Sequence, residues 1–263
     1  MPATRAPLDS DALRACIDST EWRRVDVVEE TGSTNADLIT RAGRGEDIAG
    51  AVLLAEHQTA GRGRHGRQWS APPRSQISMS VGVGTGDVAP DGWGWLPLLT
   101  GLAVVDAVRG FGVDATLKWP NDVLVGSGKL AGILAEVAAP VVVVGLGLNV
   151  SLTEAELPDP RAVSLAILQH EVDRTELTGV LLAGLSARVQ RWRTARGADD
   201  DLAADYRAAS STIGTRVRAL LPGGDEFTGV ATGIDDSGRL VIDRDGTPVN
   251  VSAGDITHLR PAD

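Results

Sequence analysis

Cysteine is almost absent from this sequence, because Cys16 is the only one. A single thiol excludes an internal disulfide, and it also excludes zinc or iron–sulfur sites that need several cysteines. A chain with so little cysteine fits a reducing compartment, so we expect a cytoplasmic location.

A long uncharged apolar segment is also missing. The N-terminal stretch MPATRAPLDSDALRAC has no continuous apolar run of the kind found in a secretion signal. The longest apolar candidate, AGILAEVAAPVVVVGLGLNV, is interrupted by Glu136 and Pro140. A membrane-spanning helix needs about 20 predominantly apolar residues in a row, so we do not expect a membrane partner.

Basic residues are in the minority. The sequence has 25 Lys and Arg residues against 35 Asp and Glu residues, which gives a formal net charge of -10 at pH 7. A chain with this charge is repelled by a phosphate backbone, so we do not expect nucleic acid as a partner.

What the sequence does contain is a regular succession of predicted strands and helices. With 43% hydrophobic residues it can bury a sizeable core. Apolar alternation and β-branched runs predict strands at Val25–Val28, Ala51–Glu56, Ile77–Val83, Leu117–Trp119, Asp122–Val125, Leu130–Val137 and Val141–Val150. The runs on either side of Gly126–Gly128 are close enough to form an antiparallel hairpin.

Four segments have the pattern of helices. Thr34 to Asp37 reads T-x-x-D, a capping box that would begin a helix closed by Gly43. LPLLTGLAVVDAVRGFG predicts a mostly buried helix, and Leu202–Ala209 predicts a shorter one. The helix expected at Thr175–Thr194 has one apolar stripe that we interpret as packing surface: Leu177, Leu181, Leu185, Val189 and Trp192.

The composition changes near Ser211. Before this point the acidic run Asp199–Asp201 is most simply a solvated turn, and after it RVRAL, FTGVA, RLVID and PVNVS alternate in hydropathy. Four or five short strands with tight turns predict a small β-barrel or sandwich. We therefore expect two domains, residues 1–210 and residues 211–263, in a chain of the α/β (α+β) class.

The segment GRGRHGRQW, Gly61 to Trp69, concentrates positive charge on a glycine-rich loop. It matches G-x-G-x-x-G, but the following RQWSAPPRS forbids the helix that a dinucleotide site needs. Three arginines on such a loop suit a mobile clamp for anionic oxygens. A solvated basic loop, or an RNA contact with interleaved arginine and aromatic side chains, explains the spacing equally well.

Polar residues interrupt the segment LKWPNDVLVGSGKLAGILAEV. Lys118 and Lys129 stand alone among apolar residues, where each either reaches solvent or meets an anion. Asn121 and Asp122 follow a proline at a predicted strand end, which indicates either a ligand site or a tight connection.

Two further motifs are rich in small residues. GLGLN, Gly145 to Asn149, would let a ligand approach the backbone of an apolar strand. GSTN, Gly32 to Asn35, either caps the following helix or presents its free N–H groups to a polar ligand.

Together these motifs resemble those of the biotin protein ligases, also called biotin-[acetyl-CoA-carboxylase] ligases. ETGSTNADL, AEHQTAGRGRHGRQWSAP, KWPNDV, GKLAGILAEV and GLGLN stand in the order and spacing of that family. The resemblance implies a class II synthetase-like core with a mixed, largely antiparallel sheet flanked by helices in residues 1–210. It implies a small SH3-like β-barrel in residues 211–263.

The resemblance also implies a two-step reaction. The carboxylate of biotin attacks the α-phosphate of ATP in the presence of Mg²⁺, which gives biotinyl-5'-AMP and pyrophosphate. A lysine of a biotin carboxyl carrier domain of an acyl-CoA carboxylase then takes the biotinyl group and releases AMP. The first step brings an anion against a polyanion, so the site must supply positive charge and fixed geometry.

Residue roles follow from the same resemblance. It places biotin against Ser33, Thr34, Asn35, Gln58, Gly61, Arg62, Gly63, Arg64, Lys129, Gly132 and Gly145. It places the nucleotide against Arg64, Arg67, Trp69, Lys118, Asn121 and Asn149. Lys129 and Arg62 would be catalytic, and Asp122 would help to hold Mg²⁺, a cation that prefers oxygen ligands.

Members of this family that repress transcription carry an added N-terminal winged helix-turn-helix domain. Only residues 1–24 precede the first predicted strand here, so we expect a ligase without repressor function. Two other functions stay open: a module that binds biotin without reaction, and a lipoate or octanoate ligase or transferase of the same fold.

Overall fold

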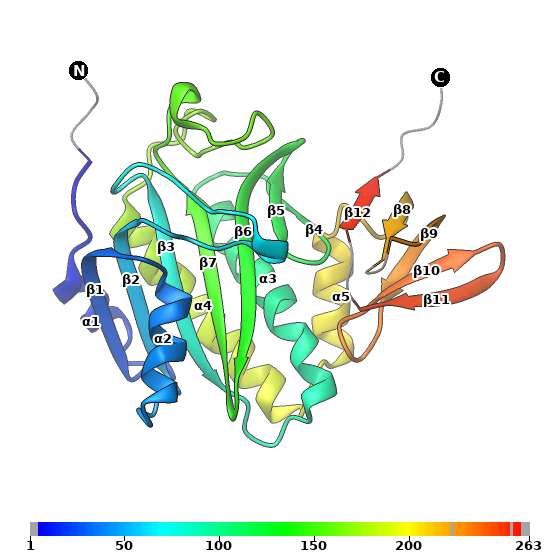
Figure 1. Ribbon diagram of the computed structural model, residues 1–263, viewed down its shortest axis with the longest axis horizontal. Coiled ribbons are helices and arrows are strands. Elements are labelled where there is room, and N and C mark those ends of the chain that lie inside the picture. Colours follow the sequence, from blue (N-terminus) through cyan, green and yellow to red (C-terminus); the bar gives the residue numbers. More distant parts are fainter. Residues whose placement is uncertain (1–4, 222–223, 253–254, 259–263) are drawn as a thin grey trace.

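The computed structural model describes residues 5–221, 224–252 and 255–258, and of the last range only the backbone. Its larger sheet has seven strands: β1 (Arg24–Thr31), β2 (Ala51–Gln58), β3 (Gln76–Gly84), β4 (Thr116–Lys118), β5 (Asp122–Val125), β6 (Gly128–Ala138) and β7 (Val141–Asn149). They lie in the order β1-β2-β3-β7-β6-β5-β4 (Figure 1). Only β1 and β2 pair in parallel, which confirms the mixed, largely antiparallel sheet and the hairpin of β5 and β6.

Helices cover both faces of this sheet. They are α1 (Ser10–Cys16), α2 (Thr34–Gly43), α3 (Leu96–Arg109), α4 (Arg174–Thr194) and α5 (Asp200–Ala209). Figure 1 shows α3 and α4 behind the sheet and α2 in front of it. Side chains of a strand alternate between faces, so Val52 and Leu54 join the large core with α3 and α4, while Leu53 packs with Leu38 of α2.

The apolar stripe predicted on α4 is confirmed. Its five residues, Leu177, Leu181, Leu185, Val189 and Trp192, have no exposed side-chain surface. Burying a leucine-sized side chain contributes about 1.5–3 kcal/mol, so this stripe fixes α4 against the sheet without any ligand. In the part of the chain that the structure describes, no helix is long and apolar enough to cross a membrane.

Two predictions at helix starts were wrong. Ser33, not Thr34, is the N-cap of α2, and its Oγ accepts from the Ala36 amide. Thr34 is therefore the first residue of the helix. Asp37 does not complete a capping box, because its carboxylate accepts from the hydroxyl of Thr31 at 2.5 Å. The acidic run Asp199–Asp201 is largely exposed but starts a helix rather than forming a turn, because Asp199 caps α5 by accepting from the Leu202 amide and Asp200 and Asp201 are its first residues.

Helix α1 was not predicted. It is only seven residues long, and Leu13 is its one fully buried residue, so it has too few turns to show an apolar period. Its start is set by Asp9, whose carboxylate accepts from the Asp11 and Ala12 amides.

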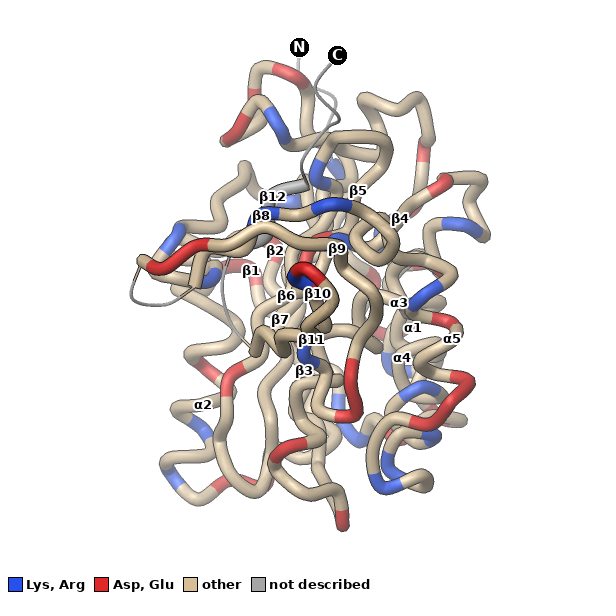
Figure 2. The backbone as a smooth tube through the Cα atoms, turned by 90° about the vertical axis from the view of Figure 1, so that its right-hand side faces the viewer, with Lys and Arg blue, Asp and Glu red and all other residues tan. Residues whose placement is uncertain are grey.

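A second, five-stranded sheet follows α5. Its strands are β8 (Arg216–Leu220), β9 (Glu226–Ile234), β10 (Leu240–Arg244), β11 (Thr247–Val251) and β12 (Asp255–His258), all antiparallel in the order β11-β10-β9-β8-β12. Figure 2 faces this sheet and shows acidic and basic residues interspersed along it. Residues 222–223, 253–254 and 259–263 of the expected second domain lie outside the described residues. The boundary at Ser211 stays a prediction.

Indole groups of the larger domain hydrogen bond to the turn between β9 and β10. Trp95 Nε1 donates to the carbonyl of Asp235 at 3.0 Å, and Trp119 Nε1 donates to that of Gly238 at 3.1 Å. Trp119 lies between β4 and β5, next to predicted site residues. The second sheet is therefore attached close to the site.

Candidate active site

A cavity of about 520 Å³ opens on the face of the sheet that α2 covers in part. Val141 and Val143 of β7 pack under α2, and Gly145, Gly147 and Asn149 continue the same face into the cavity. The segments that line it are the start of α2, the end of β2, the arginine-rich loop, the β4–β5 turn, parts of β3, β6 and β7, and residues 158–162. The structure thus brings together all the predicted site residues except Gly61: Ser33, Thr34, Asn35, Gln58, Arg62, Gly63, Arg64, Arg67, Trp69, Lys118, Asn121, Asp122, Lys129, Gly132, Gly145 and Asn149.

One end of the cavity is a network of uncharged hydrogen-bonding groups. Thr34 donates its amide and its hydroxyl to Gln58 Oε1, at 2.9 and 3.2 Å. The hydroxyls of Thr34 and Ser80 lie 2.6 Å apart, and Ser80 Oγ donates to Asn35 Oδ1 at 2.6 Å. Because Thr34 begins a helix, backbone and side-chain groups converge here on a small volume.

Asn35 connects this network to strand β6. Its Nδ2 donates to the carbonyl of Leu134 at 3.1 Å and to Glu136 Oε2 at 2.8 Å. Glu136 Oε2 also accepts from Arg62 Nη2 at 2.9 Å. The first arginine of the arginine-rich loop is thus held at the same end as the Thr34 network.

Glycines of β6 and β7 let side chains lie flat on the sheet. A Cβ on Gly145 would come within 2.2 Å of Asn35 Oδ1, and one on Gly147 within 2.1 Å of Trp69 Nε1. A Cβ on Gly132 would approach Lys129 and Trp69 at 3.2 Å. The space that a Cβ would fill at these glycines is thus occupied by Asn35, Trp69 and Lys129. A ligand in the cavity would contact these side chains rather than the glycine backbone.

The arginine-rich loop, residues 61–69, is folded back on itself. Trp69 donates its amide to the Gly61 carbonyl at 2.9 Å, and Gly63 donates to the Arg67 carbonyl at 2.7 Å. His65 between them has a φ of 56°, in the left-handed region. Gly61 lies outside the cavity, where a Cβ would meet the Trp69 carbonyl at 2.3 Å, so its part is to let the two ends of the loop meet.

Further along the loop, side chains turn toward the sheet. Arg64 Nη1 donates to Asn121 Oδ1 at 3.2 Å, and Trp69 Nε1 donates to Gln76 Oε1 at 3.0 Å. Gln76 in turn donates to Asn149 Oδ1 at 2.7 Å. Asn149 is buried and donates to the Val163 carbonyl at 2.9 Å, so it orders the floor beneath Trp69.

Lys129 lines the cavity from the start of β6. Its Nζ is 2.6 Å from Asp122 Oδ1 and 5.5 Å from the centroid of the Trp69 ring. A cation near an aromatic face is attracted by the ring quadrupole. Carboxylate and ring together hold this ammonium group in one position while leaving it a third exposed.

The segment after β7 forms the rim at the Lys129 end. Lys129 donates its amide to the Arg161 carbonyl at 2.7 Å, and its own carbonyl accepts from Val163 at 3.0 Å. Arg161 also donates to both carboxylate oxygens of Asp159, which lowers the pKa of Asp159 to about 2. The rim therefore carries an exposed charge pair beside the cavity.

A metal site made by the protein alone is not present in residues 5–221, 224–252 and 255–258, which contain no group of three or more His, Cys, Asp or Glu suited to an ion. Asp122 faces the cavity, but its Oδ1 is already paired with Lys129. Mg²⁺ is often bound by one or two carboxylates together with substrate phosphates. The described carboxylates do not by themselves fit a resident Mg²⁺, and the role of Asp122 as a ligand stays a prediction.

Comparison with known proteins identifies the family of this chain. Residues 33–151 match the Biotin/lipoate A/B protein ligase family, and residues 212–259 match the Biotin protein ligase C terminal domain. A biotin–[acetyl-CoA-carboxylase] ligase of Mycobacterium tuberculosis is 54% identical and covers 97% of both chains. The chain belongs to the biotin protein ligase family.

More distant members of the biotin protein ligase family are similar as well. The bifunctional ligase/repressor BirA of Escherichia coli is 30% identical over 91% of this chain and 75% of its own. The solved structure of the biotin protein ligase from Aquifex aeolicus in complex with biotin and ATP superposes with a TM-score of 0.77, at 25% identity over 91% of this chain and 100% of that one.

Sequence reasoning missed several residues in and around this cavity. Gln76 lines the cavity from β3, and Ser80 of the same strand lies behind the lining residue Thr34, 2.6 Å from its hydroxyl. Their alternation in QISMS was a signal, since polar residues at every second position of an apolar strand share one face. Glu136 was noted only as a break in an apolar run. Asp159 and Arg161 lie in an irregular segment whose sequence carries no comparable pattern.

Proposed function

We propose that this chain forms biotinyl-5'-AMP from biotin and ATP, and then transfers the biotinyl group to a lysine of a biotin carboxyl carrier domain in an acyl-CoA carboxylase. The observation that carries the proposal is one cavity that contains a neutral polar end, a floor on which Asn35 and Trp69 lie against glycines of β7, and an ion-paired lysine. It is supported by the 54% identical relative, which is named a biotin–[acetyl-CoA-carboxylase] ligase.

Biotin would lie with its ureido group at the Thr34 end. That group is neutral and has both donors and acceptors, and the hydroxyl of Thr34 and the side-chain amides of Asn35 and Gln58, which all line the cavity, offer both as well. Apolar residues beside them, including Met79, suit the ring and the valeryl chain. The carboxylate would then point along β6 toward Lys129.

The first step would take place at Lys129. The biotin carboxylate is ionised at neutral pH, so no base is needed. Its oxygen forms a bond to the α-phosphorus of ATP, and the bond from that phosphorus to the bridging oxygen breaks, so pyrophosphate leaves with the electron pair. The Lys129 ammonium, oriented by Asp122 and Trp69, stabilises the negative charge that builds up between the two anions.

The arginine-rich loop would hold the intermediate between the two steps. Arg62 is paired with Glu136 and Arg64 contacts Asn121. These contacts keep both guanidinium groups in the lining of the cavity, where a ligand could meet them. In the second step the amine of the carrier lysine attacks the acyl carbon, AMP leaves, and the nitrogen loses its extra proton as the amide forms. Mg²⁺, when bound with ATP, would neutralise phosphate charge.

Mass spectrometry of a carrier domain tests the proposal directly. The full chain is incubated with that domain, biotin, ATP and Mg²⁺, and the expected product is one biotinyl group on a single lysine. Omitting ATP should abolish the product. An unmodified carrier domain, with biotin binding retained, would instead show a binding module.

A parallel assay separates the related acids. Biotin, lipoate and octanoate are offered in turn, and AMP formation is measured. AMP formation driven by lipoate or octanoate would overturn the proposed substrate. We further propose a cytoplasmic enzyme without repressor activity, and a mobility shift at a biotin operator with biotin and ATP at physiological salt would contradict the latter.

A further inference from the structure

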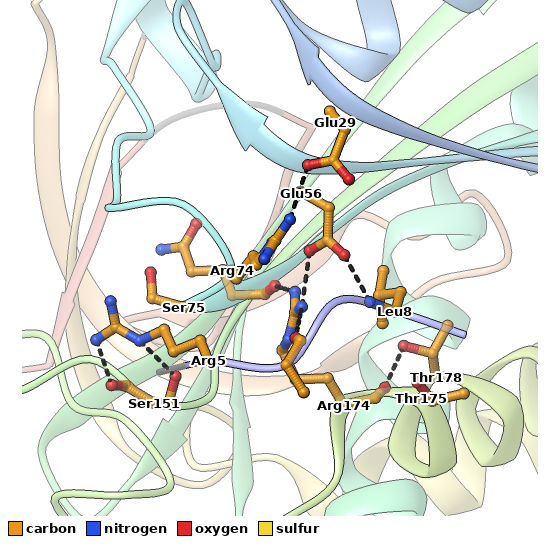
Figure 3. A network of polar contacts seen from close by, with 12 residues as sticks. Arg5, Leu8, Glu29, Glu56, Arg74, Ser75, Ser151, Arg174, Thr175 and Thr178 are labelled. Carbon is orange, nitrogen blue, oxygen red and sulfur yellow. Dashed lines mark hydrogen bonds and ion pairs between the residues drawn. The ribbon is translucent and has the colours of Figure 1, made fainter. Parts of the chain in front are cut away.

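An extended N-terminal strap, residues 5–9, crosses the edge of the larger domain before α1 begins (Figure 3). The Ala6 carbonyl accepts from Arg174 Nη2 at 2.7 Å, and the Leu8 amide donates to Glu56 Oε1 at 2.5 Å. Arg174 and Glu56 pair with each other at 2.7 Å, with side chains 8% and 2% exposed. A buried, hydrogen-bonded ion pair between α4 and β2 thus anchors the strap.

Arg5, at the start of the strap, reaches the segment that follows β7. Its Nε and Nη2 donate to the hydroxyl and the carbonyl of Ser151, at 3.0 and 2.7 Å. Its Nη2 and Nη1 donate to the two carboxylate oxygens of Glu156, at 2.6 and 3.3 Å. The guanidinium therefore grips two points of this segment with its rigid fork of donors.

Glu156 is the central acceptor of that segment. Besides Arg5, its Oε2 accepts from the amide and the hydroxyl of Thr153, both at 2.9 Å. The turn between Thr153 and Glu156 is closed by this carboxylate. Because Arg5 binds the same carboxylate, it stabilises the position of the whole turn and not only that of the Glu156 side chain.

The segment held in this way is the rim of the active-site cavity. We define the rim loop as residues 151–163. Arg5 holds its first half, and backbone hydrogen bonds to Lys129 hold its last residues. Between these attachments lie the cavity-lining residues Pro158 and Asp159, with Arg161 and Ala162 next to Lys129.

The rim loop lies at one end of the cavity only. Asn35 bonds to β6 at Leu134, and the rim loop bonds to β6 at Lys129. These positions are five residues apart, which is about 17 Å along an extended strand. The rim loop is thus remote from the neutral polar end formed around Thr34.

We propose that Arg5 is a positioning residue for the nucleotide: it holds the rim loop in the conformation that completes the Lys129 end of the cavity. The inference rests on the proposed function, in which biotin occupies the Thr34 end and ATP lies beyond Lys129. Arg5 contacts none of the groups at the Thr34 end, so its removal should affect the ATP side more than the binding of biotin.

Steady-state kinetics of the full chain test this, with AMP formation measured against biotin and against ATP separately. Arg5→Gln should raise the KM for ATP about tenfold while the KM for biotin changes less than about twofold. Arg5→Lys, which keeps the charge but not the fork, should fall between wild type and Arg5→Gln. The matched control is Arg193→Gln, which removes another partly buried pair, with Glu21 at 2.6 Å, away from the cavity.

A double-mutant cycle with Arg5→Gln and Glu156→Gln tests whether the rise in the KM for ATP comes from the Arg5–Glu156 contact. If the Arg5–Glu156 contact is responsible, the double variant should raise the KM for ATP no further than either single variant. Additive effects, an equal rise in both KM values, or an unchanged KM for ATP in Arg5→Gln would overturn the proposal.

Hydrogen exchange measures the order of the rim loop without relying on enzymatic activity. Amides of the rim loop should exchange faster in Arg5→Gln than in wild type, and amides of α4 should not. If wild type forms no AMP, the proposed function fails, but this measurement still decides whether Arg5 orders the rim loop. Unchanged exchange in the rim loop would refute the positioning role.

Discussion

Lys129 and Asp122 form an ion pair between neighbouring strands, with 2.6 Å between Nζ and Oδ1. Asp122 begins β5 and Lys129 is the second residue of β6, so the hairpin places the two charges across a strand pair. The same ammonium group lies 5.5 Å from the centre of the Trp69 ring. One cation is thereby presented where biotin and ATP would meet.

Replacing Lys129 by Ala should lower the rate of adenylate formation more than tenfold, a barrier increase of at least about 1.4 kcal/mol. The fold should persist, because the side chain is a third exposed and the β5–β6 pairing is made by the backbone. Biotin-dependent exchange between ATP and labelled pyrophosphate measures the rate, and circular dichroism checks the fold. A variant with more than a tenth of the wild-type rate would refute the role of Lys129.

Asp122→Asn separates the two roles open to this carboxylate. We expect slower adenylation, by about tenfold, because Lys129 loses its charged partner. The Mg²⁺ concentration for half-maximal rate should stay the same, since Asp122 Oδ1 is engaged by Lys129. A clear rise in that concentration would show instead that Asp122 holds the metal.

Arg62→Lys keeps the charge of the loop but removes the planar fork. We expect biotinyl-5'-AMP to dissociate about tenfold faster, because a lysine cannot make the bidentate contacts of a guanidinium. Release can be followed after rapid dilution of the loaded enzyme, with the remote Arg14→Lys as control. Equal release rates for Arg62→Lys and wild type would disprove the clamp.

Gly147→Ala should displace Trp69 from the sheet. The new Cβ would lie 2.1 Å from Trp69 Nε1, so the indole must move and lose its 3.0 Å hydrogen bond to Gln76. We expect slower adenylation and a loss of about 1–3 kcal/mol in the free energy of unfolding. The control is Gly43→Ala, where a Cβ meets nothing within 4 Å, and an unchanged adenylation rate in Gly147→Ala would contradict the placement of Trp69.

The Arg5–Glu156 pair should persist across the physiological pH range. Hydrogen bonds from Arg5 lower the pKa of Glu156 from 4.5 to about 2. A carboxylate with a depressed pKa contributes its full stabilisation above its unfolded-state pKa and loses it as pH falls toward the folded-state pKa. The difference in unfolding free energy between wild type and Glu156→Gln should therefore be constant from pH 8 to 5 and shrink below pH 4.5. Urea unfolding at pH 7, 5 and 3 measures it, and a difference that already shrinks between pH 7 and 5 would contradict this assignment.

Much of the fold was predictable from local pattern. Alternation located all seven strands of the larger sheet, and spacings of three and four located the buried stripe of α4. These signals are strong because a strand or a long helix repeats one relation between a residue and the core many times. Where an element is short, as in α1, the repetition is missing and the pattern fails.

The sequence by itself determined which residue types can do the chemistry: a glycine-rich loop with arginines, isolated lysines in apolar strands, and amides at strand ends. Only the tertiary structure decided their partners. Arg62 meets Glu136 across 74 positions of the chain, and Arg5 meets Glu156 across 151. Such pairs depend on sheet order and strand register, which are set by the packing of the whole core, so local spacing carries no record of them.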